Sequence, residues 1–108
     1  MGVEKVVIRV NEVGEHEFDW WIDRGRRWWV AKADRVLNAH ELIVIDSVNV
    51  VRAAGRIYGV LKDIEDGSGR VSIEVLPDED SPLLGKEIQR SKSRNPVAYM
   101  SDIEVISE

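Results

Sequence analysis

The chain has 108 residues, no cysteine, and a net charge of -5 from 15 basic and 20 acidic side chains. This length supports one modest hydrophobic core, and the lack of cysteine excludes disulfide bonds and thiolate metal sites. Because counter-ion release needs a basic surface, the acidic balance argues against general affinity for nucleic acid.

No membrane or secretory segment is expected. The apolar stretches fall short of the roughly 18 residues that a transmembrane helix needs, and Glu4, Lys5 and Arg9 interrupt the apolar start of the chain. We therefore expect a cytoplasmic protein with no membrane partner. Charged residues make up 32% of the chain, and Gln89 is its one glutamine, a composition compatible with a heat-adapted source.

The first expected element is a strand near the N-terminus. Val6, Ile8 and Val10 alternate with Val7 and Arg9. Since side chains along a strand point to opposite faces in turn, this pattern predicts a strand with one apolar face.

All four tryptophans lie in one short stretch, in two adjacent pairs on either side of Arg24-Gly25. If Arg24-Gly25 is the tip of a β-turn, residues 16–22 and 27–32 form a hairpin in which Trp21 lies opposite Trp28. Alternation then separates two faces: Phe18, Trp20, Ile22, Trp29 and Ala31 on one, and Asp19, Trp21, Trp28, Val30 and Lys32 on the other. If only the first face is core, the second displays the Trp21/Trp28 pair, which would mark an interaction site. The general burial of tryptophan in small domains favours the other arrangement, in which the sheet is covered on both faces and all four tryptophans are packed.

The middle of the chain is expected to contain one helical turn and a second hairpin. Residues 31–38 carry the one plausible helical turn in this region. Residues 42–45 are apolar at every position, which is typical of a central strand. Asp46-Ser47 predicts a turn into the next strand, in the register that pairs Ile45 with Val48.

A third hairpin is predicted from Gly55 to Leu76. Gly55 and Gly59 allow strong strand curvature, as barrels require. The segment Asp66-Gly67-Ser68-Gly69 is not followed by a helix and has acidic neighbours, so it predicts a hairpin turn and not a phosphate-binding loop. The strand after it, residues 70–75, alternates strictly, with Val71, Ile73 and Val75 inward.

The longest irregular stretch runs from Pro77 to Pro96. Such stretches are usually functional or disordered. Asp80-Ser81-Pro82 is expected to open a helical turn, and residues 86–94 are expected to form a mobile basic loop. The closing strand is expected at Ile103, Val105 and Ile106.

These elements predict an all-β (mainly β) fold, with residues 1–108 forming a small single-domain antiparallel barrel, OB- or SH3-like, with at most one short helix. The hairpin of residues 55–76 is similar to the central hairpin of an OB-type barrel. The aromatic-then-apolar rhythm of Gly25 to Val51 resembles the soluble barrel of the NfeD family. Neither likeness carries a specific motif, so no activity or residue role follows from it.

The sequence shows no recognisable catalytic or cofactor apparatus. His16 and His40 are the two histidines, and nothing in their spacing brings them together with a carboxylate as a metal site. Ser47 and Ser68 have no evident base beside them. The clustered carboxylates lie in acidic loops that favour solvent exposure over a raised pKa. We therefore expect no enzyme, no metal and no cofactor.

Charge is unevenly distributed. Residues 23–35 carry five basic and two acidic side chains, and residues 86–94 carry four basic and one acidic, whereas residues 62–80 carry two basic and seven acidic. If the two basic stretches meet in space, an acidic protein presents one positive face. If they do not meet, each is an ordinary solvated surface.

Two functions remain open. The leading hypothesis is a binding module for single-stranded nucleic acid, with tryptophans stacking on bases and basic side chains contacting phosphates. The alternative is a protein-interaction or self-association module, such as a homodimer, that uses the same surface. The candidate binding residues are Trp21, Arg24, Arg26, Arg27, Trp28, Lys32, Lys86, Arg90, Lys92 and Arg94.

Overall fold

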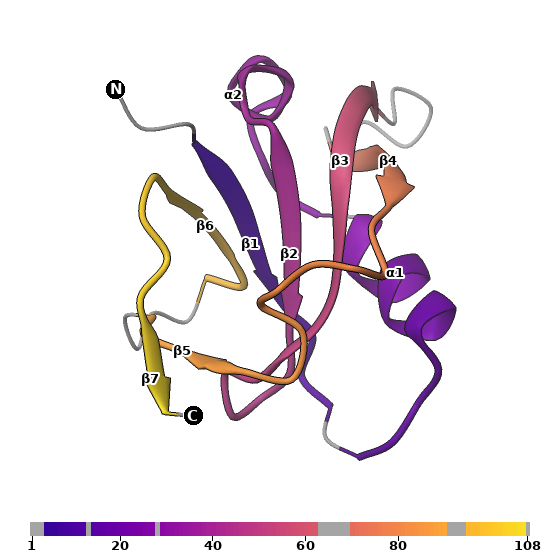
Figure 1. The fold of residues 1–108 in the computed structure, drawn as a ribbon. Helices are drawn as coiled ribbons and strands as arrows, with labels where there is room; N and C mark the ends of the chain where they lie inside the picture. The colour runs from indigo at the N-terminus through magenta and orange to yellow at the C-terminus, as the bar shows by residue number, and fades with distance from the viewer. Residues whose placement is uncertain (1–3, 13, 28, 63–69, 91–94, 108) are drawn as a thin grey trace.

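The computed structural model describes residues 4–12, 14–27, 29–62, 70–90 and 95–107 (Figure 1). Strand residues outnumber helical residues in this part of the chain. The elements in chain order are β1 (Lys5–Arg9), α1 (Phe18–Arg26), α2 (Ala33–Asn38), β2 (Glu41–Ile45), β3 (Val51–Lys62), β4 (Val71–Pro77), β5 (Glu87–Ile88), β6 (Val97–Met100) and β7 (Val105–Ser107).

Five strands form one sheet in the order β4-β3-β2-β1-β6, and β5 pairs with β7 in a separate two-stranded sheet. The pair β1–β2 is parallel, with Val7 beside Ile43, and the other neighbours are antiparallel. The expectation of a purely antiparallel sheet is therefore wrong. The physical reason is the connection, since two helices lie between β1 and β2 and provide the crossover that parallel neighbours need.

The sheet is buried on both faces. On the central strand β2, Leu42 and Val44 belong to a core shared with α1 and α2, while Ile43 and Ile45 belong to a second core under Leu83, Leu84 and Ile88. In Figure 1 the orange segment between β4 and β5 crosses in front of β2 and β3. The central-strand prediction for residues 42–45 is confirmed. The single apolar face predicted for the first strand is wrong, because the fully buried Val7 belongs to the second core.

The predicted tryptophan hairpin is wrong, because residues 18–26 form the helix α1. Trp21, Ile22 and Gly25 are its buried positions, and this spacing places them on one helical stripe. Asp23 and Arg27 lie four residues apart and form an ion pair of 3.0 Å, a spacing that favours a helix. The hairpin prediction treats Arg24-Gly25 as a turn and does not consider this helical spacing of the apolar residues.

Gly25 permits close contact between α1 and the sheet. A Cβ atom at this position would lie 2.4 Å from one methyl carbon of Val44 and 2.8 Å from the other. Val44 is fully buried in the central strand, so it has little room to move. The residue that was expected to turn a hairpin is therefore a packing position inside a helix.

A short segment connects the two edges of the sheet. Trp29 exchanges two backbone hydrogen bonds with Val71 of β4, and the amide of Lys32 donates to the hydroxyl of Tyr99 in β6. Trp29, Ala31 and Tyr99 pack against the core that α1 and α2 share with the sheet. The segment from Trp29 to Lys32 therefore bridges the two edge strands on the helix side of the sheet.

This bridge does not close the sheet into a barrel. Among the described residues, the segment from Trp29 to Lys32 lies between β4 and β6, and no strand pairing joins these two edges. The expected closing strand is found as β7, but it pairs with β5. The expectation of at most one short helix is wrong, because α1 takes the place of the predicted hairpin. The fold is mainly β with two short helices, and it is not a closed barrel in the described residues.

The second hairpin exists in a different register from the predicted one. Ile45 pairs with Val51 and not with Val48. The fully buried carboxylate of Asp46 accepts hydrogen bonds from the amides of Val48 and Val50, each 3.0 Å long, and from Nε of Arg52 at 2.9 Å. This anchored turn is longer than the predicted two-residue turn.

The remaining predictions had mixed outcomes. The helical turn in residues 31–38 is confirmed as α2, and the strands predicted around residues 55–63 and 70–75 are found as β3 and β4. The helical turn expected after Asp80 is a hydrogen-bonded turn, and the predicted basic loop includes β5. Strand β6 was not predicted. The glycine turn of residues 65–69 lies outside the described residues.

Replacing Gly25 by alanine is expected to lower the free energy of unfolding by about 1–3 kcal/mol, because the new methyl group overlaps the side chain of Val44. In an unpacked helix the same change would be stabilising by about 1 kcal/mol, so the sign tests the contact. Gly59→Ala is the control, since a Cβ atom there meets its nearest neighbour at 3.7 Å. Chemical denaturation of both variants measures the difference. An increase in stability of Gly25→Ala would contradict the observed packing.

Replacing Trp21 by alanine is expected to lower the free energy of unfolding by about 3–5 kcal/mol, because its side chain is 1% exposed in the core under α1. Val30→Ala serves as the control, since Val30 is 68% exposed. Thermal and urea unfolding of the two variants provide the measurement. Equal stabilities would place Trp21 on the surface, as the hairpin required.

Candidate functional site

The tryptophans do not form the predicted exposed pair. Trp21 is buried, and its ring meets that of Trp20 edge to face, with 4.8 Å between the ring centroids. Trp21 therefore has no exposed face on which a base could stack, because the helix turns it toward the sheet. Trp28 lies outside the described residues.

Trp20 is half-buried and already has neighbours on its ring. His16 stacks on it with 3.6 Å between the ring centroids and an interplanar angle of 12°. The guanidinium carbon of Arg24 lies 5.0 Å from the Trp20 centroid. These contacts combine aromatic stacking with a cation–π interaction, so Arg24 is held at the surface by the ring beneath it.

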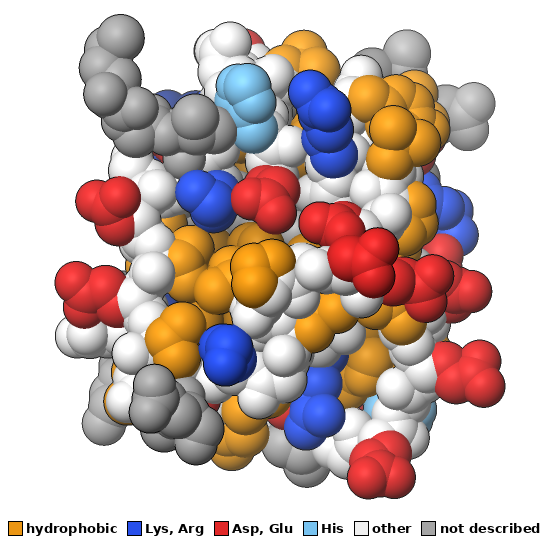
Figure 2. Space-filling model, viewed as in Figure 1, with side chains coloured by type: hydrophobic (Ala, Val, Ile, Leu, Met, Phe, Trp, Pro, Cys, Tyr) orange, Lys and Arg blue, Asp and Glu red, His pale blue; other side chains and the backbone are white. Residues whose placement is uncertain are grey.

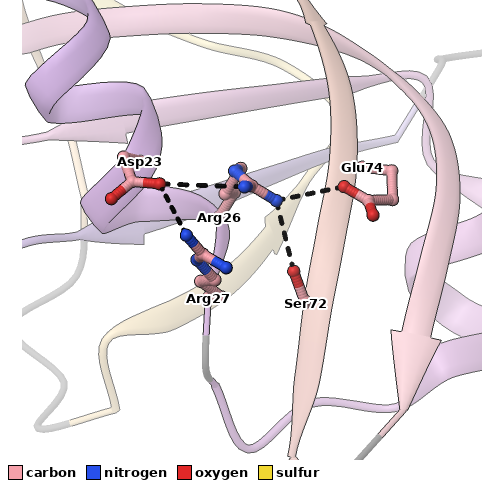
Figure 3. A network of polar contacts seen from close by, with 5 residues as sticks. All are labelled: Asp23, Arg26, Arg27, Ser72 and Glu74. Carbon is pink, nitrogen blue, oxygen red and sulfur yellow. Dashed lines mark hydrogen bonds and ion pairs between the residues drawn. The ribbon is translucent and has the colours of Figure 1, made fainter.

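Arg26 is held in a network of polar contacts (Figure 3). Its Nη1 atom donates to a carboxylate oxygen of Glu74 at 3.0 Å and to the hydroxyl of Ser72 at 3.4 Å. Asp23 lies 3.7 Å from Nη2 of Arg26 and accepts a hydrogen bond of 3.0 Å from Arg27. Arg26 therefore connects α1 to the edge strand β4, and its charge is already compensated.

A shallow depression lies beside the end of α1. Its volume is about 280 Å³, and its lining residues are Val10, Asn11, Glu12, Arg24, Arg27 and Trp29. Trp29 is half-buried, and its indole N–H donates to the carbonyl oxygen of Gly25 at 3.0 Å, which fixes the ring at this position. We refer to Arg24, Arg27 and Trp29 as the α1 surface.

The other predicted basic residues do not join the α1 surface. Lys86 is exposed and immediately precedes β5, whose Ile88 belongs to the core on the opposite side of the sheet. Arg90 was expected on an exposed loop, but it is 6% exposed, because the chain around it packs against that second core. Lys32 is exposed beside Tyr99. Lys92 and Arg94 lie outside the described residues.

The two basic stretches therefore do not form one positive face in the described part of the chain. Figure 2 shows one side of the molecule, on which basic side chains stand singly and hydrophobic side chains gather over the centre. Among the described residues, no group of three or more His, Cys, Asp or Glu side chains could hold a metal ion. Neither helix that the structure describes is long and apolar enough to span a membrane.

Sequence reasoning missed several residues that shape this site. Val10, Asn11 and Glu12 line the depression together with the α1 surface. They directly follow β1, and no pattern in the sequence indicates that they lie beside the tryptophan stretch. The available signals for the helix were the spacing of Asp23 and Arg27 and the apolar spacing of Trp21, Ile22 and Gly25. Comparisons with protein-family models, with curated proteins and with solved structures gave no match.

Replacing Arg26 by methionine is expected to lower the free energy of unfolding by about 1 kcal/mol, because Glu74 and Ser72 lose a charged hydrogen-bond donor at a position only 24% exposed. Arg24→Met is the matched control, with an expected change within about 0.5 kcal/mol at an exposed position. Urea denaturation at low and high salt measures both. A smaller loss for Arg26→Met than for Arg24→Met would contradict the network.

Proposed function

We propose that this protein is a non-enzymatic binding module that contacts a protein partner through the α1 surface. The observation that carries this proposal is the depression of about 280 Å³ that Arg24, Arg27 and Trp29 line together. Tryptophan and arginine contribute most of the binding energy at many protein interfaces, particularly around pockets. A partner side chain that fills this depression would meet both residue types.

The charge of Arg24 favours a partner with a carboxylate. Arg24 is exposed, and among the described residues its side chain contacts the ring of Trp20 and no carboxylate. Arg27 shares Asp23 with Arg26, so its charge is only partly compensated. An Asp or Glu side chain of the partner would pair with these guanidinium groups, while an adjacent apolar side chain would pack on Trp29.

Three observations favour a protein over nucleic acid as the partner. Arg26 and Arg27 are bound to acidic side chains of the same chain. Glu12 places a carboxylate in the depression, where it would repel a phosphate. The described part of the second basic stretch, residues 86–90, lies across the sheet from α1, so it does not extend the α1 surface. Affinity for a polyanion needs several unpaired cations on one face.

Single-stranded nucleic acid remains the second candidate. Its support is the combination of two guanidinium groups with a half-buried tryptophan in one depression, since aromatic rings and basic side chains together bind single strands. Self-association is a form of the first proposal, with a second copy of this chain as the protein partner.

The double variant Arg24→Ala/Arg27→Ala is expected to weaken partner binding by tenfold or more, a change of about 1.4 kcal/mol, while leaving the melting temperature almost unchanged. Both residues are exposed, so little packing is lost. Sedimentation equilibrium measures binding to a second copy, and affinity capture on the immobilised protein measures binding to other proteins. Lys62→Ala is the control, because Lys62 is exposed at the far end of β3.

Titration with a single-stranded oligonucleotide at several salt concentrations separates the two candidates. Salt-dependent binding whose slope falls by about 0.7 per lost phosphate contact in the double variant would establish nucleic acid as the partner. Equal retention of every partner by the wild type, the double variant and the Lys62→Ala control would show that the α1 surface is not the contact site.

A further inference from the structure

A second candidate site lies around Arg90, on the opposite side of the sheet from the α1 surface and independent of the function proposed for that surface. The side chain of Arg90 is 6% exposed. Its Nη2 atom donates to the carbonyl oxygen of Asn95 at 2.8 Å. Its Nε and Nη1 atoms are buried and have no hydrogen-bond partner among the described residues. A buried polar group without a partner is uncommon in folded proteins.

The position is unfavourable for a charged side chain. Burial lowers the pKa of Arg90 from its usual value, and the positive charge of Arg9 lowers this pKa further. Even so, a guanidinium group remains charged under ordinary conditions. Arg9 adds repulsion and not compensation, and no carboxylate of the described residues forms an ion pair with Arg90, although burial of a charge normally requires such a partner.

Arg90 borders a depression of about 280 Å³ whose other lining residues are Gln89, Met100, Asp102 and Glu104. This volume lies just below the range of about 300–1,000 Å³ that drug-sized ligands occupy, so an occupant would be small. The lining combines one guanidinium, two carboxylates, an amide and the apolar side chain of Met100. A simple anion would be attracted by Arg90 and repelled by Asp102 and Glu104.

We propose that this depression binds a small zwitterion, such as a free α-amino acid, whose carboxylate pairs with Arg90 and whose ammonium group lies against Asp102 and Glu104. A ligand carrying both charges compensates the positive charge of Arg90 and the negative charges of both carboxylates at once. Neither half of such a ligand does so alone. Gln89 provides an amide that can accept from the ammonium or donate to the carboxylate.

Calorimetric titration of the purified protein with each of the twenty standard amino acids tests this proposal. Acetate and ethylamine serve as probes for the two half-ligands, and inorganic phosphate as a probe for simple anions. At least one amino acid is expected to bind about tenfold or more tightly than any of these three probes. The proposal is overturned if no amino acid binds at millimolar concentration, or if acetate or phosphate binds as tightly as the best amino acid.

Variants then assign the contacts. Arg90→Met is expected to abolish binding and to keep or raise the melting temperature of the ligand-free protein, because it removes an uncompensated buried charge. Asp102→Asn/Glu104→Gln is expected to weaken amino-acid binding by about tenfold or more while leaving acetate binding unchanged or stronger. Glu79→Gln/Asp80→Asn, at two exposed acidic positions outside the lining, is the charge-matched control and should bind like the wild type.

One alternative is that Asp102 or Glu104 turns inward and pairs with Arg90 in solution. In that case Arg90→Met would lower the melting temperature sharply, and the double carboxylate variant would lower it as well. That pair of results, together with unchanged amino-acid binding in either variant, would overturn the proposal.

Discussion

The close contact between α1 and the central strand is the constraint on which the rest of the structure depends. Gly25 has no side chain, so the helix backbone can lie directly on the side chain of Val44. This contact fixes the distance between the helix and the sheet, and the positions of Trp21 and Ile22 fix its rotation, because both must point into the same core. Once distance and rotation are set, every other residue of α1 has a determined direction. The exposed chemistry of this part of the molecule is therefore a consequence of its packing.

The three arginines of α1 and its C-cap show this dependence. Arg26 is the neighbour of Gly25, and it reaches the edge strand β4, where Glu74 and Ser72 bind it. Arg24 points to solvent over the ring of Trp20, and Arg27 continues past the helix end toward Asp23. Adjacent residues of the same type thus have different roles. A basic residue in this stretch therefore does not by itself indicate a binding site. Arg26 stabilises the contact between α1 and β4, whereas Arg24 and Arg27 border a depression on the surface.

The sequence was sufficient to predict the elements whose apolar pattern has a single interpretation. Residues 42–45 are apolar at every position, and β4 alternates strictly, so both strands were predicted correctly. The tryptophan stretch has two interpretations, because Arg24-Gly25 suits a hairpin tip while the spacing of Trp21, Ile22 and Gly25 suits a helix, and only contact with Val44 decides between them. The parallel pairing of β1 with β2 and the burial of Arg90 depend on residues distant in the sequence. A pattern within a short stretch of sequence therefore cannot predict these features.

The position of β1 between β2 and β6 also has a consequence for how the chain is made. Val7 lies beside Ile43 on one side and beside Ala98 on the other. During synthesis β1 is translated before both of its neighbours, and β6 follows only after α1, α2 and the strands β2 to β5. One edge of β1, a strand whose three central residues are apolar and buried, therefore stays unpaired until β6 has been made. An unpaired edge of this kind is a template for pairing with other chains, and β6 removes it by occupying that edge.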